Sequence, residues 1–136
     1  MESRIQKTLE NHKKGYNCAQ AVACAYCDLV GVDEATMFKA AEAFGAGMGG
    51  MSATCGAVAG AVLLAGFKNS DGDIAAPKTK KDTYKLSKQI VAEFVEKNTS
   101  SVCKELKGIE TKNCLRSCDG CIEDAAALVE KILFAE

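Results

Sequence analysis

An uncharged, glycine-rich segment in the middle of the chain most constrains the fold. No charged residue occurs between Glu42 and Lys68, and glycines stand at positions 45, 47, 49, 50, 56, 60 and 66. Only the second half, Ser52 to Ala65, reads as a continuous helix, which is shorter than the ~20 apolar residues that a bilayer requires. The sequence therefore predicts a buried central helix, and we expect no membrane insertion.

The composition favours packed helices around this segment. The chain has 136 residues, which suits one domain over 1–136, with abundant Ala and Gly, one Pro and 6% aromatic residues. Basic (17) and acidic (18) side chains nearly cancel to a formal charge of -1, so we expect no nucleic-acid partner. We predict an all-α fold, a compact bundle of about five to seven helices around the Gly/Ala-rich central helix.

Capping signals and periodicity place the other helices. Ser3 with Gln6 and Asn17 with Gln20 have the form of capping boxes. The helices predicted around the central one are Ser3 to Gly15, Cys18 to Val30, a helix capped by Asp33, Thr79 to Lys97, a short helix from Ser100 or Ser101 to Leu106, and Asp119 to Ala135. Gly45 to Gly50 and Lys68 to Pro77 are predicted as loops.

Eight cysteines are the feature that bears most on function. Because the N-terminal segment has no apolar h-region and no cleavage site of a signal peptide, we expect cytoplasmic residence and reduced thiols. In that compartment an excess of cysteine indicates metal ligation or redox chemistry. Any one of these cysteines, taken alone, is equally well explained as a small buried apolar residue.

Four cysteines fall at predicted helix N-termini. They are, in chain order, Cys18, Cys55, Cys103 and Cys118. Free backbone N–H groups and the helix dipole stabilise a thiolate there by ~0.3 to 1 kcal/mol, which moves a thiol pKa from about 8.5 to about 7.5. A helix end alone therefore activates a thiol without ionising it fully, and metal coordination would complete the deprotonation.

The remaining cysteines are Cys24, Cys27, Cys114 and Cys121. Cys24 and Cys27 form one C-x2-C pair, and Cys118 and Cys121 form another. The two pairs are much further apart in the sequence than the two pairs of a zinc ribbon. We interpret Cys24 and Cys27, in an Ala-rich helix, as buried structural thiols. The segment 114–121 holds three cysteines, and we predict that it is a ligand-rich loop.

The chain lacks the patterns of hydrolases and kinases. Its single histidine, His12, falls in line with Ile5 and Leu9 as a partly buried helix residue. No Ser-His-Asp or Cys-His arrangement, phosphate loop or paired-carboxylate site is present in the sequence. Activity as an oxidoreductase and a role as a non-enzymatic electron carrier both stay open.

Several short motifs occur along the chain. Each is a weak signal alone, but their order and combination are specific to a family. They are Gly15 to Ala21, Phe44 to Gly49, Cys55-Gly56-Ala57-x-x-Gly60, Cys103 to Leu106, and a last cysteine seven residues before an Ala-Ala pair. In this order they resemble the C_GCAxxG_C_C family of redox-active proteins, over nearly the whole chain. The four family cysteines then correspond to Cys18, Cys55, Cys103 and Cys118.

The resemblance implies an α-helical redox protein. A related domain in split-Soret-type cytochromes, which carry an iron–sulfur centre beside haem, favours a cluster over a simple dithiol. This chain has no C-x-x-C-H haem motif. Its additional cysteines leave the ligand set open, since Cys114 or Cys121 can replace a family position or hold part of a second or larger cluster.

We therefore expect a cytoplasmic iron–sulfur protein for electron transfer or storage, with an unidentified redox partner. The candidate thiolate ligands are Cys18, Cys55, Cys103 and Cys118, followed by Cys114 and Cys121. The Gly45 to Gly50 loop, in particular Gly49 and Gly50, together with Gly56 lets backbone approach the cluster. One alternative is a thiol–disulfide redox or sensor protein in which Cys55 cycles with a resolving cysteine. Another is a zinc-stabilised interaction module. Homodimer formation is left open.

Overall fold

The computed structural model describes residues 1–135, and helices make up its regular secondary structure. In chain order the elements are α1 (Ile5–Lys13), α2 (Cys18–Ala25), the 3-10 turn η1 (Cys27–Val30), α3 (Glu34–Glu42), α4 (Gly45–Met48), α5 (Gly56–Asn69), α6 (Lys80–Asn98), α7 (Cys103–Lys107), α8 (Cys118–Leu128) and the π-helical turn η2 (Val129–Leu133). Within that range no strand is formed beyond an isolated bridge between Thr54 and Val102. The predicted all-α fold is confirmed.

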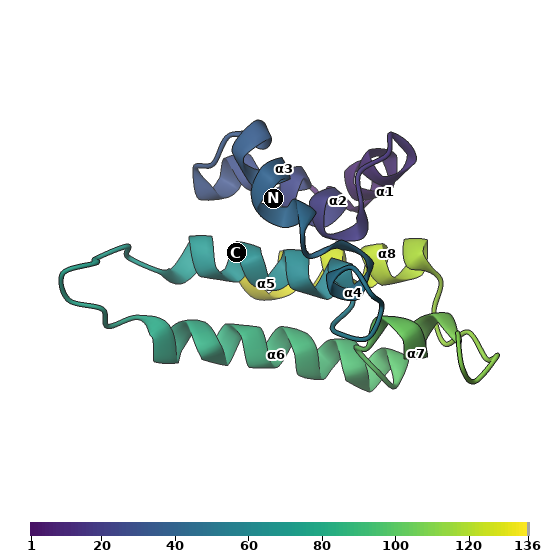
Figure 1. Ribbon diagram of the computed structural model, residues 1–136. Coiled ribbons are helices and arrows are strands. Elements are labelled where there is room, and N and C mark those ends of the chain that lie inside the picture. The colour runs from purple at the N-terminus through teal and green to yellow at the C-terminus, as the bar shows by residue number, and fades with distance from the viewer. Residues whose placement is uncertain (136) are drawn as a thin grey trace.

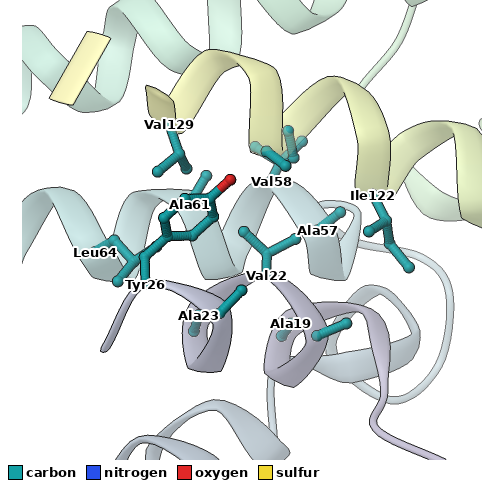
Figure 2. Close-up of a cluster of buried hydrophobic side chains, with 14 of the residues drawn as sticks. Ala19, Val22, Ala23, Tyr26, Ala57, Val58, Ala61, Leu64, Ile122 and Val129 are labelled. Atoms are coloured by element: carbon teal, nitrogen blue, oxygen red, sulfur yellow. The ribbon is translucent and has the colours of Figure 1, made fainter. Parts of the chain in front are cut away.

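Helix α5, which carries no charged residue before Lys68, lies at the centre, as predicted. Figure 1 shows α1 to α3 on one side of α5 and α6 running along the other side, and α8 also packs on α5. The core forms where α2, α5 and the α8–η2 segment meet, from Ala19, Val22, Ala23, Tyr26, Ala57, Val58, Ala61, Leu64, Ile122 and Val129, all fully buried (Figure 2). None of the helices in residues 1–135 has the length and apolar character needed to cross a membrane.

Small residues let α2 and α5 approach closely. A Cβ atom at Gly60 would lie 2.6 Å from the carbonyl oxygen of Ala19, closer than real Cβ atoms come to backbone. At Gly56, one turn earlier, a Cβ atom would lie 3.3 Å from the backbone nitrogen of the same alanine. The two glycines on one face of α5 therefore receive the N-terminal turn of α2.

The start of α5 differs from the prediction. The sequence predicts a helix from Ser52 that Gly66 closes, but α5 begins at Gly56, with Cys55 as its N-cap residue, and continues past Gly66 to Asn69. The chain before Gly56 is held by two hydrogen bonds, from Cys55 N–H to the Ser101 carbonyl (2.7 Å) and from Cys103 N–H to the Ala53 carbonyl (3.0 Å). These bonds remove the preceding residues from the helix and join the start of α5 to the start of α7.

Two further predictions about helix ends are wrong. The helix predicted over Cys18 to Val30 breaks at Tyr26, whose buried ring reaches across to Glu130 with a hydroxyl-to-carboxylate distance of 2.5 Å. The Ser3 capping box does not form, because the Ser3 hydroxyl donates to Glu130 instead (3.3 Å) and Arg4 occupies the N-cap position. In both places the side chain makes a tertiary contact with Glu130. A local sequence signal carries no information about a partner so far along the chain.

The caps that matter for the cysteines do form. Asn17 and Gln20 make the predicted capping box at the start of α2, and Asp33 caps α3. Ser117 caps α8 by accepting a hydrogen bond from Gly120 N–H (3.0 Å). The first turns of α2 and α8 are therefore fixed by side chains immediately before Cys18 and Cys118.

Candidate functional site

Five cysteine side chains line one small cavity where α2, α4, α5, α7 and α8 come together. They are Cys18, Cys55, Cys103, Cys118 and Cys121, and the cavity is completed by Ala46, Gly47, Gly56, Leu106, Lys107 and Arg116. Its volume is about 20 Å³, which is room for roughly one water molecule. Sulfur atoms from distant parts of the sequence are thus gathered in one place.

Four of these sulfurs belong to residues at the starts of helices. Cys18, Cys103 and Cys118 are the first residues of α2, α7 and α8, and Cys55 is the N-cap residue of α5. The first backbone N–H groups of a helix have no partner within the helix, and they carry the positive end of its dipole. At Cys55, backbone N–H groups of Val58 and Ala57 favour negative charge on the sulfur.

The sulfurs are hydrogen-bonded in pairs. Cys121 is paired with Cys55, Cys18 is paired with Cys118, and the Lys107 ammonium donates to Cys118. The hydrogen bond from Cys121, assisted by backbone N–H groups at the start of α5 and opposed by burial, lowers the pKa of Cys55 to about 7. Cys55 therefore ionises more readily than an ordinary cysteine thiol.

The other buried thiols hold their protons more tightly. Burial, followed by the charges of Cys118 and Cys55, raises the pKa of Cys18 to about 12. The hydrogen bond to Cys55 and then burial raise the pKa of Cys121 far above its ordinary value, and burial raises the pKa of Cys103. A bound cation or metal would have to displace these protons before the thiols could act as thiolate ligands.

Two basic side chains flank the sulfurs. Lys107 lies one helical turn after Cys103 on α7, and Arg116 is held by the buried carboxylate of Asp124, with an Nε–Oδ2 distance of 3.1 Å and an Nη2–Oδ1 distance of 3.3 Å. Histidine and carboxylate side chains are missing from the described cavity lining. Thiols beside two cations make the site suited to an anionic, thiolate-bound occupant.

Glycine permits the close contacts around the cavity at two positions. Gly47 has a φ of +54°, and a Cβ atom there would lie 2.4 Å from Cβ of Cys103. A Cβ atom at Gly56 would lie 3.3 Å from Cβ of Cys18. Gly56 therefore lines the site as the sequence suggests. Gly49 and Gly50, in contrast, are exposed and lie outside the cavity, and a Cβ atom added at either position would meet nothing within 4 Å.

Three cysteines lie away from the cavity. Cys24 and Cys27 are buried in the core, where the sequence places them as structural thiols. Cys114 is exposed on the 108–117 connection between α7 and α8. Of the three cysteines in segment 114–121, Cys118 and Cys121 reach the cavity because they stand one turn apart on the same face of α8.

Sequence reasoning missed Lys107 and Arg116, whereas Gly47 belongs to the Gly45 to Gly50 loop that the sequence places beside the site. The spacing of Lys107 four residues after Cys103 was a usable signal, because it puts both side chains on one helix face. Arg116 carries no comparable signal, since its position depends on Asp124 in the following helix. The cationic part of the site is therefore a finding of the tertiary structure.

The cysteine cavity does not have the form of a site for a single metal ion. Across residues 1–135, no group of three or more His, Cys, Asp or Glu side chains has an arrangement that could hold one. In an iron–sulfur cluster, cysteine ligands bind different iron atoms, so their sulfurs stand further apart than around one ion. The all-sulfur donor set fits such a cluster chemically, but a cavity of about 20 Å³ would have to open to admit it.

Comparison with family models gives a match over most of the chain. A family model with the description "Putative redox-active protein (C_GCAxxG_C_C)" matches residues 16–132, a range that contains all five cavity-lining cysteines. No curated protein and no solved structure matches the chain.

Proposed function

Because the chain belongs to the C_GCAxxG_C_C family of redox-active proteins, we propose that it is an iron–sulfur protein that transfers or stores electrons at the cysteine cavity. The observation that carries this proposal is the convergence of five cysteine side chains on one cavity flanked by two cations. Thiolate is the ligand that iron–sulfur clusters require. When bound, the cluster would supply one-electron redox chemistry.

Cys18, Cys55, Cys103 and Cys118 are the proposed ligands. Their positions at helix starts support this assignment, because backbone N–H groups offset the negative charge of a thiolate-bound cluster. Cys121 is a fifth candidate that, in this structure, hydrogen-bonds to Cys55. Cys114, exposed on the 108–117 connection, provides the control position.

The positive charges of Lys107 and Arg116 would raise the reduction potential of the bound cluster. A reduced cluster carries one more negative charge than an oxidised cluster, and nearby cations stabilise the more negative form. Removing either charge should therefore lower the reduction potential. Asp124 acts indirectly, by holding the Arg116 guanidinium through two hydrogen bonds.

Loading the site requires a local movement. The segment 102–118 carries Cys103 at one end and Cys118 at the other, and its middle consists of the short helix α7 and the exposed connection after it. Outward displacement of this segment is the change that enlarges the cavity without disturbing the α2–α5 packing. Hydrogen exchange in 102–118 should therefore differ between metal-free and loaded protein.

A thiol–disulfide function is the second candidate, favoured by the Cys55–Cys121 pair. A peroxide would convert the Cys55 thiolate to a sulfenic acid with release of hydroxide, and attack by Cys121 sulfur would form the disulfide with release of water. The low pKa of Cys55 supports the first step. The zinc-stabilised module, a further alternative, has less support because the thiols are not arranged around a single ion.

Anaerobic reconstitution with iron and sulfide tests the proposal. We expect a coloured protein with iron and acid-labile sulfide, and loss of at least half of the iron in each of Cys18→Ala, Cys55→Ala, Cys103→Ala and Cys118→Ala. Cys114→Ala should retain the wild-type amount. Protein that stays colourless and iron-free rejects the cluster; a Cys55–Cys121 disulfide after peroxide then supports the thiol function, and stoichiometric zinc without a redox response supports the interaction module.

A further inference from the structure

An apolar groove of about 680 Å³ lies between α5 and α6. This volume falls within the ~300 to 1,000 Å³ typical of small-molecule sites. Its lining combines small side chains, such as Ala59 on α5 and Ala92 on α6, with larger residues such as Phe44 and Leu63. Figure 1 shows these two helices side by side, with α4 against α5 near the end where α6 leads into α7.

The polar lining of the groove consists of two hydroxyls, which can donate or accept hydrogen bonds, and one ammonium group, which can only donate. These groups belong to Thr54, Ser87 and Lys88, and among the described lining residues there is no carboxylate. Ser87 already donates to the carbonyl oxygen of Thr83 (3.3 Å). A ligand that matches this lining has an apolar body and an oxygen that accepts a hydrogen bond, with Lys88 as the strongest donor.

The groove and the cysteine cavity share a wall. Within residues 44–48, Phe44 and Met48 line the groove, whereas Ala46 and Gly47 line the cavity. Immediately after this wall segment, Thr54 lines the groove and the adjacent Cys55 lines the cavity. The backbone of residues 46 to 48 is left-handed, with φ values of 51°, 54° and 59°. A molecule in the groove would therefore lie on the other side of this segment from the cysteine cavity.

We propose that this groove is a binding site for a flat, apolar ring compound with carbonyl oxygens, of the quinone class. The apolar walls would take the ring, and Lys88 would donate to a carbonyl oxygen. The choice of a redox-active ring over other apolar molecules with acceptor oxygens rests on the proposed redox function, because it follows from the wall shared with Cys55. Binding itself follows from the groove and needs no cluster.

Methyl NMR of the full chain, both metal-free and after anaerobic reconstitution, tests the proposal. The probe is tetramethyl-1,4-benzoquinone, whose fully substituted ring resists thiol addition. We expect saturable shifts confined to methyl groups of the groove, such as Ala59 and Val91, in both forms of the protein. Ala92→Phe should fill the groove and weaken binding at least tenfold, while Ala40→Phe, an equally exposed alanine on α3, should leave it unchanged. Lys88→Met should weaken binding about tenfold through loss of the charged donor.

Four outcomes would overturn the proposal. They are shifts that are absent or spread outside the groove, equal affinity for tetramethylbenzene without oxygens, tighter Lys88-dependent binding of decanoate, and ligand-free dimerisation through the groove methyls. The first denies the site, the next two assign it to hydrocarbons or fatty acids, and the last makes it a face for a second copy. Groove binding by protein that takes up no iron would leave the binding inference standing while rejecting the iron–sulfur proposal, so the two failures are distinguishable.

Discussion

The thiol of Cys121 donates a hydrogen bond to the sulfur of Cys55, although one residue lies in α8 and the other caps α5. The two helices pack directly on each other, with Ala57, Val58 and Ile122 in the shared core (Figure 2). The proton of Cys121 therefore stabilises negative charge on Cys55, and neither thiol titrates independently of the other.

The Cys55–Cys121 pair predicts a pH profile for thiolate formation. In reduced, metal-free protein, the ultraviolet thiolate absorbance that is lost in Cys55→Ala should titrate with a midpoint near pH 7, because the pKa of Cys55 is lowered to about 7. Cys121→Ala removes the donor and should move this midpoint upward by about one pH unit. The difference in absorbance between each protein and its Cys55→Ala counterpart measures both profiles, because no reagent has to reach the buried thiol. Cys114→Ala should leave the profile unchanged, and a wild-type midpoint near 9 would contradict the structure.

Alanine substitutions at three glycines of one segment distinguish the energetic cost of a steric contact from the cost of backbone strain. Gly47→Ala combines a φ of +54° with a Cβ 2.4 Å from that of Cys103, Gly49→Ala has only the positive φ of +86°, and Gly50→Ala has neither. We expect Gly47→Ala to destabilise by about 2 to 4 kcal/mol, Gly49→Ala by about 1 to 2, and Gly50→Ala by less than about 0.5. Urea denaturation measures the series. Equal losses of unfolding free energy in Gly47→Ala and Gly49→Ala would show that Cys103 is not in close contact with Gly47.

Alanine substitutions at two glycines of α5 should change the free energy of unfolding in opposite directions. At Gly60 the added methyl would lie 2.6 Å from the Ala19 carbonyl oxygen, so Gly60→Ala should cost about 1 to 3 kcal/mol of unfolding free energy. Gly66 has nothing within 4 Å and ordinary helical geometry, so Gly66→Ala should stabilise by about 0.5 to 1 kcal/mol. Thermal unfolding of both variants checks the signs. A stabilising Gly60→Ala would mean that α2 and α5 are not in close contact.

Asp124 should contribute stability that depends on pH. Burial opposes its ionisation, but hydrogen bonds from Lys97, Arg116 and Asn98 outweigh burial and hold its pKa below the ordinary value. Because the folded pKa is the lower one, the contribution is complete above the unfolded carboxyl pKa near 4 and is lost as the pH falls through the folded value. Asp124→Asn should therefore cost about 1 to 3 kcal/mol at pH 7 and progressively less below about pH 4.

Urea titrations at several pH values test the role of Asp124. The exposed Asp28, paired with Arg4 at 2.6 Å, provides the matched control, and Asp28→Asn should cost less than about 1 kcal/mol. A difference between wild type and Asp124→Asn that stays constant from pH 7 to pH 3 would show that the buried carboxylate does not gain from its partners.

Local signals in the sequence predict the helices well where the cap is a side chain. The capping boxes and caps at Asn17 and Asp33 depend on groups within a few residues, so their geometry is contained in the sequence. The start of α5 could not be found this way, because hydrogen bonds from Cys55 to Ser101 and from Cys103 to Ala53 decide where the helix begins. Element type was therefore predictable for the longer helices, and boundaries set by distant partners were not. The prediction of a loop at Gly45 to Gly50 is wrong for Gly45–Met48, which form the short, irregular helix α4.

For the site, the sequence by itself determined that Cys18 and Cys118 stand at helix starts, since the side-chain caps Asn17 and Ser117 immediately precede them. The helix starts at Cys55 and Cys103 depend on their hydrogen bonds to distant backbone. Only the tertiary structure decided that Cys121 joins them while Cys114 stays in solvent, and that Lys107 and Arg116 supply positive charge. The physical reason is that capping is a short-range interaction, whereas the orientation of a sulfur or a guanidinium depends on how α5, α7 and α8 pack against one another.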